Sequence, residues 1–158
     1  LEALDVSRCI RLTSISLFPN NLLTTLDVST CPNLVSLICS HNSLTSINAS
    51  GCSKLKGIDC SFNSLTSLNV SGCSDLRDLD CSYNQLTDLD VSDCVNLEEL
   101  DCMYNKITKE IPAAFKRLSL FYHDRRYEYH SNGTYTDIGV GWWYPGEPES
   151  GKHAWPDE

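Results

Sequence analysis

The chain has 158 residues, a formal net charge of −9 at pH 7 and nine cysteines. The acidic balance disfavours nucleic acid and anionic membranes as partners, because both carry negative charge. No stretch approaches the roughly 18 consecutive apolar residues of a membrane-spanning helix. We therefore expect no nucleic-acid partner and no membrane insertion of this segment.

A 21-residue repeat begins at the N-terminus and runs through most of the chain. The copies occupy residues 1–11 (second half only), 12–33, 34–54, 55–75, 76–96 and 97–117. We align residues 12–33 with one extra residue between Leu22 and Leu26, and the last copy changes character at Lys106. One copy cannot bury its apolar face alone, whereas a stack of three or more copies can. The repeat therefore predicts a solenoid.

Aligned copies place apolar residues in five columns that predict the core. The columns are Leu12, Leu34, Leu55, Leu76, Leu97 and Leu118; Ile15, Leu37, Ile58, Leu79, Leu100 and Phe121; Leu22, Leu44, Leu65, Leu86 and Ile107; Leu4, Leu26, Ile47, Leu68 and Leu89; and Val6, Val28, Ala49, Val70 and Val91. Coils stacked about 4.8 Å apart, as neighbouring strands are, would bury these columns continuously.

The pattern L-x-x-L-x-C-x-x-N-x-L resembles the leucine-rich repeat. The short unit with Cys after the strand and L-T-x-L-D-V-S after the Asn is similar to the cysteine-bearing repeats of bacterial internalin-type surface proteins. The resemblance implies a leucine-rich-repeat solenoid of the α/β repeat class, mostly parallel β with little helix. We expect a right-handed, curved stack of about five to six coils.

A column of asparagines recurs where each strand should leave the sheet. Its members are Asn20, Asn42, Asn63, Asn84 and Asn105. At this point the backbone loses its sheet partners, and a buried carboxamide can supply both a donor and an acceptor to adjacent coils. We therefore interpret the column as structural rather than as a ligand site.

The nine cysteines fall into two columns. These are Cys39, Cys60, Cys81 and Cys102, and Cys9, Cys31, Cys52, Cys73 and Cys94. Parallel Cβ directions on neighbouring strands disfavour disulfide geometry, and an odd number leaves one thiol unpaired. No pair has the C-x-x-C type of spacing that zinc sites use. We predict nine buried, reduced thiols acting as small apolar residues, with no metal and no cofactor.

The outward residues of the predicted strands change from small and neutral to acidic along the chain. Leucine-rich repeats usually bind ligands on this concave strand face, so the resemblance marks five candidate contacts. They are Asp59, Asp78, Asp80, Glu99 and Asp101. Stacked like charges repel unless water, a nearby base or a ligand relieves them. The candidate bases are Lys56, Arg77, Arg125 and Arg126. A solvated acidic face is one interpretation, and a site for a basic protein surface or a calcium ion is the other.

An aromatic column precedes the asparagines at His41, Phe62, Tyr83 and Tyr104. We interpret it as packing beside the buried asparagines, with a strip for sugar or peptide as the alternative. Together with Trp142 and Trp143, Tyr83 and Tyr104 could form an aromatic platform.

After Lys106 the sequence resembles plant-type leucine-rich repeats, with Pro112 suited to the first turn of a short helix. Leu118 and Phe121 give a last repeat strand. RRYEYH, a turn at residues 131–133 and TYTDIGVGWWY then predict an aromatic β-hairpin. We expect two parts, a solenoid at 1–121 and a hairpin cap with a tail at 122–158, because the open end of a solenoid needs a cover.

These features favour a non-catalytic binding module that recognises a protein or a glycan. The family resemblance implies an extracellular or bacterial cell-surface location, with a signal or anchor outside this fragment, and we expect a monomer. A structural spacer in a larger surface protein is the alternative. A hydrolase-like enzyme is a remote third hypothesis, because the histidine and tyrosine cluster of residues 123–130 lacks a matched nucleophile.

Overall fold

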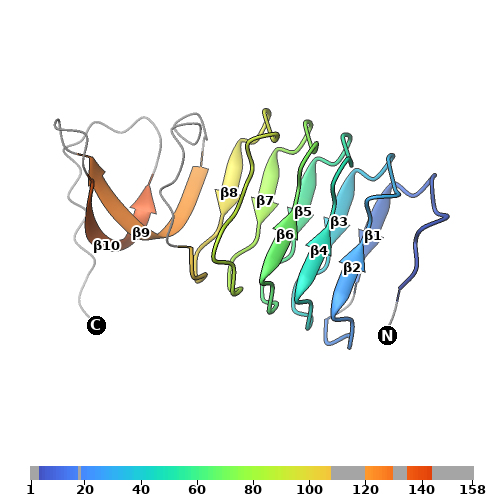
Figure 1. The fold of residues 1–158 in the computed structure, drawn as a ribbon, viewed down its shortest axis with the longest axis horizontal. Coiled ribbons are helices and arrows are strands. Elements are labelled where there is room, and N and C mark those ends of the chain that lie inside the picture. Colours follow the sequence, from blue (N-terminus) through green and yellow to red (C-terminus); the bar gives the residue numbers. More distant parts are fainter. Residues whose placement is uncertain (1–3, 18, 108–119, 130–134, 144–158) are drawn as a thin grey trace.

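The computed structural model describes residues 4–17, 19–107, 120–129 and 135–143, arranged as two rows of short parallel strands followed by a hairpin (Figure 1). The first row contains β1 (Ser14–Ser16), β3 (Ser36–Ile38), β5 (Gly57–Asp59), β7 (Asp78–Asp80) and β8 (Glu99–Asp101). The second row contains β2 (Thr25–Asp27), β4 (Ser46–Asn48) and β6 (Ser67–Asn69). Within the described ranges there is no helix, and the arrangement confirms the predicted solenoid.

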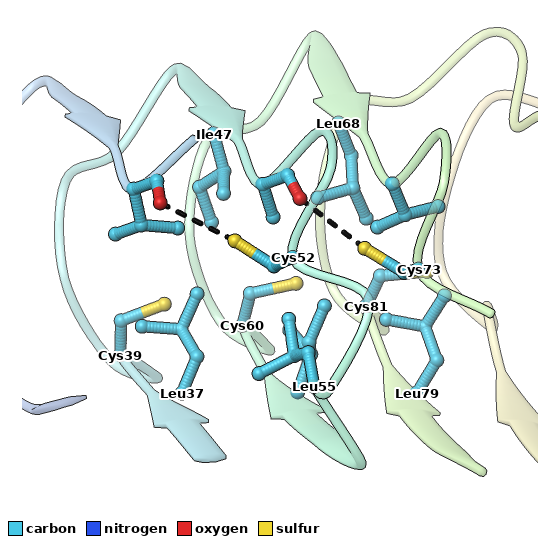
Figure 2. Packing of buried hydrophobic residues seen from close by; sticks show 14 of the residues in the cluster. Leu37, Cys39, Ile47, Cys52, Leu55, Cys60, Leu68, Cys73, Leu79 and Cys81 are labelled. Carbon is cyan, nitrogen blue, oxygen red and sulfur yellow. Dashed lines mark hydrogen bonds between the residues drawn. The ribbon is translucent and has the colours of Figure 1, made fainter. Parts of the chain in front are cut away.

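Each strand is three residues long because only its central residue faces the core. Leu37 in β3 is fully buried and Leu26 in β2 nearly so, while the residues that flank them are partly or fully exposed. Consecutive strands pair at the repeat position, with Leu37 opposite Ile58. Apolar side chains from the two rows meet between the sheets, and the cysteines fill the remaining space (Figure 2).

The first sheet continues into the C-terminal hairpin. β9 (Leu120–Tyr129) pairs in parallel with β8, and β10 (Tyr135–Trp143) pairs with β9 in the antiparallel direction. The predicted hairpin strands are therefore confirmed. β9 crosses the predicted boundary between residues 121 and 122 without interruption, and the two-part division stays a prediction. The predicted helix after Pro112 and the turn at residues 131–133 lie outside the described residues.

The predicted alignment of the first full copy was wrong at two positions. Leu23 is 1% exposed and fills the core column, whereas Leu22 is 62% exposed. Ser16 pairs with Ile38 at an offset of 22 residues. Leu23 instead matches Leu44 at an offset of 21, so the extra residue lies between Ser16 and Leu23. Leu22 therefore takes the exposed position of Ser43 in the next coil. Asn20 is exposed and has a left-handed backbone (φ 65°), so it does not extend the buried asparagine column.

One cysteine also departs from the prediction. Cys9 is exposed, because no described coil packs on the N-terminal side of the first turn. The other eight cysteines are buried as predicted, and the structure records all nine as free thiols.

Candidate binding surface

The asparagine column holds the turns that follow the first row of strands. Asn84 donates from Nδ2 to the carbonyl oxygens of Cys60 (3.0 Å) and Cys81 (3.0 Å), and its Oδ1 accepts from the amide of Leu65 (2.9 Å). Asn63 makes the equivalent bonds one coil earlier. The carboxamide thus serves two coils at once, and its predicted structural role is confirmed for Asn42, Asn63, Asn84 and Asn105.

The cysteine thiols of the second row link neighbouring coils in a similar way. Cys52 Sγ donates to the carbonyl oxygen of Val28 at 3.3 Å, and Cys73 Sγ donates to that of Ala49 at 3.2 Å (Figure 2). Burial raises the pKa of Cys52 and Cys73 to about 11, so both thiols stay protonated and can donate. These residues act as inter-coil hydrogen-bond donors as well as apolar filler, a role that composition and spacing do not reveal.

Three aspartates in one position, Asp59, Asp80 and Asp101, form a column that we call the acidic column. In register, Asp59 lies opposite Asp80, and Asp80 lies opposite Asp101. Two further acids on the same face, Asp78 and Glu99, lie opposite each other and are exposed. The structure therefore brings the five predicted acidic residues together on the outer face of three adjacent strands.

The carboxylates of the acidic column also hold the turns that follow them. Asp80 Oδ1 accepts from the amide of Ser82 at 2.9 Å and from its hydroxyl at 2.7 Å. Asp59 makes the same two bonds with Ser61 and a third with the hydroxyl of Ser40 in the preceding coil (2.8 Å). These donors offset part of the like-charge repulsion, because a hydrogen bond to an anion stabilises it.

The sequence analysis missed this role, although a signal was present in the recurring Asp-x-Ser spacing. The second row repeats the same turn at Asp27, whose carboxylate accepts from the hydroxyl and the amide of Ser29. These two bonds lower the pKa of Asp27. Of the predicted bases, Arg77 instead pairs with Glu98 at 3.3 Å, where both side chains are exposed. The side chains of Arg125 and Arg126 lie outside the described part of the chain.

Calcium was the alternative ligand for this face. Among the residues that the structure describes, no group of three or more His, Cys, Asp or Glu side chains is placed to hold a metal ion. Oδ1 of each aspartate in the acidic column accepts hydrogen bonds from the turn that follows it, from Ser61, Ser82 and Met103.

The aromatic column forms a continuous stack that we call the aromatic ladder. It consists of His41, Phe62, Tyr83 and Tyr104. Ring centroids are 4.4 Å apart for His41 and Phe62 and 4.2 Å apart for each of the next two pairs, with interplanar angles of 9°, 11° and 21°. The rings remain on the surface, since Phe62, Tyr83 and Tyr104 are 43%, 42% and 53% exposed. The prediction that they only pack beside the asparagines is thus incomplete.

All four ladder residues adopt the left-handed backbone conformation, with φ between 52° and 56°. A bulky residue in this conformation costs about 1–2 kcal/mol. Each stacked pair returns about 0.5–1.5 kcal/mol. Three stacks therefore contribute about 1.5–4.5 kcal/mol against about 4–8 kcal/mol for four strained residues, so stacking alone does not offset the strain.

The second half of the predicted aromatic platform is only partly placed. Trp142 and Trp143 lie in β10, where their backbones pair with Tyr122 and Phe121 of β9. Tyr83 stacks on Tyr104, whereas the tryptophan side chains lie outside what the structure describes, so their part in the platform stays a prediction.

No helix in the described residues has the length and apolar character needed to cross a membrane.

Comparison with known proteins supports the repeat assignment. Residues 74–113 match the family model for leucine-rich repeats in two copies. The solved structure of the functional domain of InlJ from Listeria monocytogenes, which includes a cysteine ladder, aligns with a TM-score of 0.68 and 40% sequence identity. The alignment covers 77% of this chain and 27% of that chain, so the protein spans about a quarter of the InlJ chain's length. No curated protein sequence gives a significant match.

These matches agree with the parallel strands, the asparagine column and the two cysteine columns described above. The chain is a leucine-rich-repeat protein whose cysteine-containing repeats resemble those of the internalin type.

Proposed function

We propose that this protein is a non-catalytic binding module that recognises a protein through the outer face of the first row of strands. The observation that carries the proposal is the grouping of five acidic side chains on β5, β7 and β8, two of which, Asp78 and Glu99, are exposed. Three parallel strands hold these charges on a rigid surface. Such a surface favours a partner of opposite charge, because electrostatic complementarity steers association and selects partners.

We further propose that the module works as a monomer outside the cell or on a bacterial cell surface. The resemblance to internalin-type repeats supports this location. The net charge of −9 supports the exclusion of nucleic acid and of anionic membranes as ligands.

A structural spacer is the competing function, and one observation separates it from a binding module. A spacer has no requirement for charge at any position of its strand face, whereas this face changes from Ser14 and Ser16 in β1 to Asp78 and Asp80 in β7. An enzyme that uses residues 123–130 has less support, because the sequence offers no matched nucleophile beside the histidines of that segment.

The test is a binding screen against arrays of extracellular-matrix proteins, host-surface proteins and glycans, with and without calcium. Asp78→Lys combined with Glu99→Lys reverses exposed charges on the strand face while leaving the aspartates that hold the turns intact. Asp88→Lys is the matched control, because Asp88 is exposed and lies in the repeat position that precedes the central residue of the second row.

We expect a protein hit that the double variant loses and the Asp88 variant keeps. Equal binding by the wild type and the double variant would place the ligand site elsewhere. A silent array would favour the spacer function, and a hit that requires calcium would favour a metal-dependent site.

A further inference from the structure

The aromatic ladder is built at a position where the backbone does not need aromatic residues. In the first full coil, Asn20 adopts the same left-handed conformation (φ 65°) with a small polar side chain. Asparagine tolerates this conformation far better than phenylalanine or tyrosine does. The later coils nevertheless carry a large ring at each left-handed position, in an unbroken series from His41 to Tyr104. Strained residues that recur on an exposed surface point to a function for their side chains.

The stacking geometry determines which part of each ring a ligand can reach. A sugar binds an aromatic side chain by lying flat on the ring face. The inner faces of the ladder are covered by neighbouring rings at 4.2–4.4 Å, which leaves no room for a sugar ring between them. Phe62 and Tyr83 are stacked on both faces, so their exposed 43% and 42% is largely ring edge, whereas Tyr104 is stacked on one face only. These edges form a narrow strip of apolar carbon, interrupted by the tyrosine hydroxyls, along which aliphatic groups can pack.

The acidic column runs beside this strip at a constant spacing. Asp59 precedes Phe62 by three residues, and the same spacing relates Asp80 to Tyr83 and Asp101 to Tyr104. In the preceding coil the acidic position is occupied by Ile38, which is 43% exposed and extends the apolar surface. A lysine or arginine can pack its aliphatic stem along an apolar surface while its charged end reaches a carboxylate. A single lysine or arginine side chain can therefore contact the aromatic ladder with its stem and the acidic column with its charged end.

We propose that the aromatic ladder and the acidic column together bind a basic polypeptide segment, in which lysine or arginine alternates with aliphatic residues. This inference rests on the proposed function and narrows its ligand from a protein in general to a basic polypeptide segment. The partner's aliphatic groups lie along the ring edges of Phe62, Tyr83 and Tyr104. Its positive charges face Asp59, Asp80 and Asp101.

The probe is an array of immobilised 15-residue peptides of randomised sequence, read alongside a glycan array. The test variant combines Phe62→Asn, Tyr83→Asn and Tyr104→Asn, because asparagine suits the left-handed backbone and already occupies it at Asn20. The control is Val95→Asn, which removes an apolar side chain that is 54% exposed outside the ladder. Thermal melting of each variant reports whether it is folded, and Tyr83→Asn alone replaces the triple variant if that one is not.

We expect wild-type hits to be enriched in lysine or arginine together with leucine, isoleucine or methionine. The ladder variant should lose about tenfold or more in affinity for these peptides, and the Val95 variant should keep its affinity. Undiminished binding by the ladder variant overturns the inference. Hits that are acidic, or confined to glycans, overturn it as well.

The two proposals fail in different ways. In the first case the wild type binds basic peptides, the Asp78→Lys, Glu99→Lys double variant no longer binds them, and the ladder variant still does. The inference about the ladder is then wrong, and the strand face remains the proposed site. If neither the peptide array nor the protein array gives a hit with the wild type, the binding function itself is wrong.

Discussion

The turns that follow β5 and β7 in the first row and β4 and β6 in the second row start alike and then differ in one residue. All four open with an Asx-x-Ser segment whose Asp or Asn side chain accepts from the serine two positions on, as in Asp59 and Asn48. One residue after that serine, the backbone is left-handed at Phe62 in the first row and at Gly51 in the second. The same conformation is therefore reached with a large ring on one side of the solenoid and with no side chain on the other.

The difference teaches that the left-handed turn does not explain the aromatic residues. Glycine adopts positive φ without strain, so the second-row turn reaches this conformation without the steric penalty of a side chain. The first row replaces it with rings that stack and stay half-exposed. What distinguishes the two sides is therefore a surface property rather than a folding requirement.

Raising the pH titrates the buried cysteines behind both rows of strands. We expect it to lower the free energy of unfolding more than any of the substitutions below. Burial raises the pKa of Cys39 to about 12 and that of Cys73 to about 11, from an ordinary value of 9.0. Above pH 9.0 the unfolded chain loses thiol protons that the folded chain keeps, so the free energy of unfolding falls as pH rises. The loss attributable to Cys39 approaches about 1.4 kcal/mol per pH unit between these values.

Urea unfolding measured at pH 7, 9 and 11 checks this expectation. Cys39→Ala should make the pH dependence shallower, because one of the titrating thiols is gone. A stability that does not change across this range would show that the thiols are not protonated donors in the folded state.

Removing an asparagine from the first-row turn should have the next largest effect. Asn84→Ala leaves the buried amide of Leu65 without its partner and removes one of the two side-chain donors to the carbonyl of Cys60, the other being Asn63. We expect the free energy of unfolding to fall by about 2–3 kcal/mol, mainly the cost of the unsatisfied amide. Chemical denaturation measures the change, and Asn96→Ala, at an exposed asparagine, is the control. If both variants lose the same free energy of unfolding, the asparagine column contributes no more to stability than an exposed asparagine does.

Adding a side chain to the turn that follows the second row of strands should lower the free energy of unfolding by less than Asn84→Ala does. A Cβ at Gly51 would meet no atom within 4 Å, so Gly51→Ala tests the backbone conformation alone (φ 75°). We expect a loss of about 1–2 kcal/mol, since only the left-handed strain is added. Gly57→Ala is the matched control, because Gly57 also has open space around its Cβ position but no left-handed φ. If both variants lose the same amount, conformational strain is not the cause.

Removing a ring from the first-row turn should have the smallest effect. Phe62→Gly loses two stacked contacts but relieves the left-handed strain, so the free energy of unfolding should change by less than about 1 kcal/mol. The melting temperature and the denaturation midpoint report this change. A loss above about 3 kcal/mol would mean that the ladder stabilises the fold, and it would weaken the case for a binding strip.

Periodicity predicted the parts of this structure in which each position has one role in every coil. The apolar columns, the eight buried cysteines and the asparagines from Asn42 onward were all predictable, because stacking imposes the same environment on each copy. The position of the extra residue was not predictable. Asn20 and Asn21 are identical, as are Leu22 and Leu23, so only the packed core shows which leucine is buried.

The exposure of the aromatic residues could not be predicted from their position beside a buried asparagine. A positive φ turns the side chain away from the direction that the preceding residues suggest, and no pattern of hydrophobic residues records a dihedral angle. Asp80 both belongs to the acidic column and holds the turn that follows it. This second role could have been predicted, because the Asp-x-Ser spacing is visible in the sequence and indicates a local hydrogen bond. The second sheet, β2-β4-β6, was likewise unpredicted, although the central residues of its strands, Leu26, Ile47 and Leu68, form one of the predicted core columns.

The constant register of the first row has a consequence for how this protein can change in length. Ile58 pairs with Leu37 on one side and with Leu79 on the other, always at an offset of 21 residues. Removing a whole coil therefore rejoins two surfaces that already fit, whereas a coil of another length must absorb the difference in a turn, as happens before Leu23, where the offset is 22 residues for Ile15 and Leu37. The proposed binding surface therefore grows or shrinks most simply by whole coils, each of which moves it by about 4.8 Å. Duplication and loss of single repeats are thus the natural route by which such a surface is matched to a partner of different length.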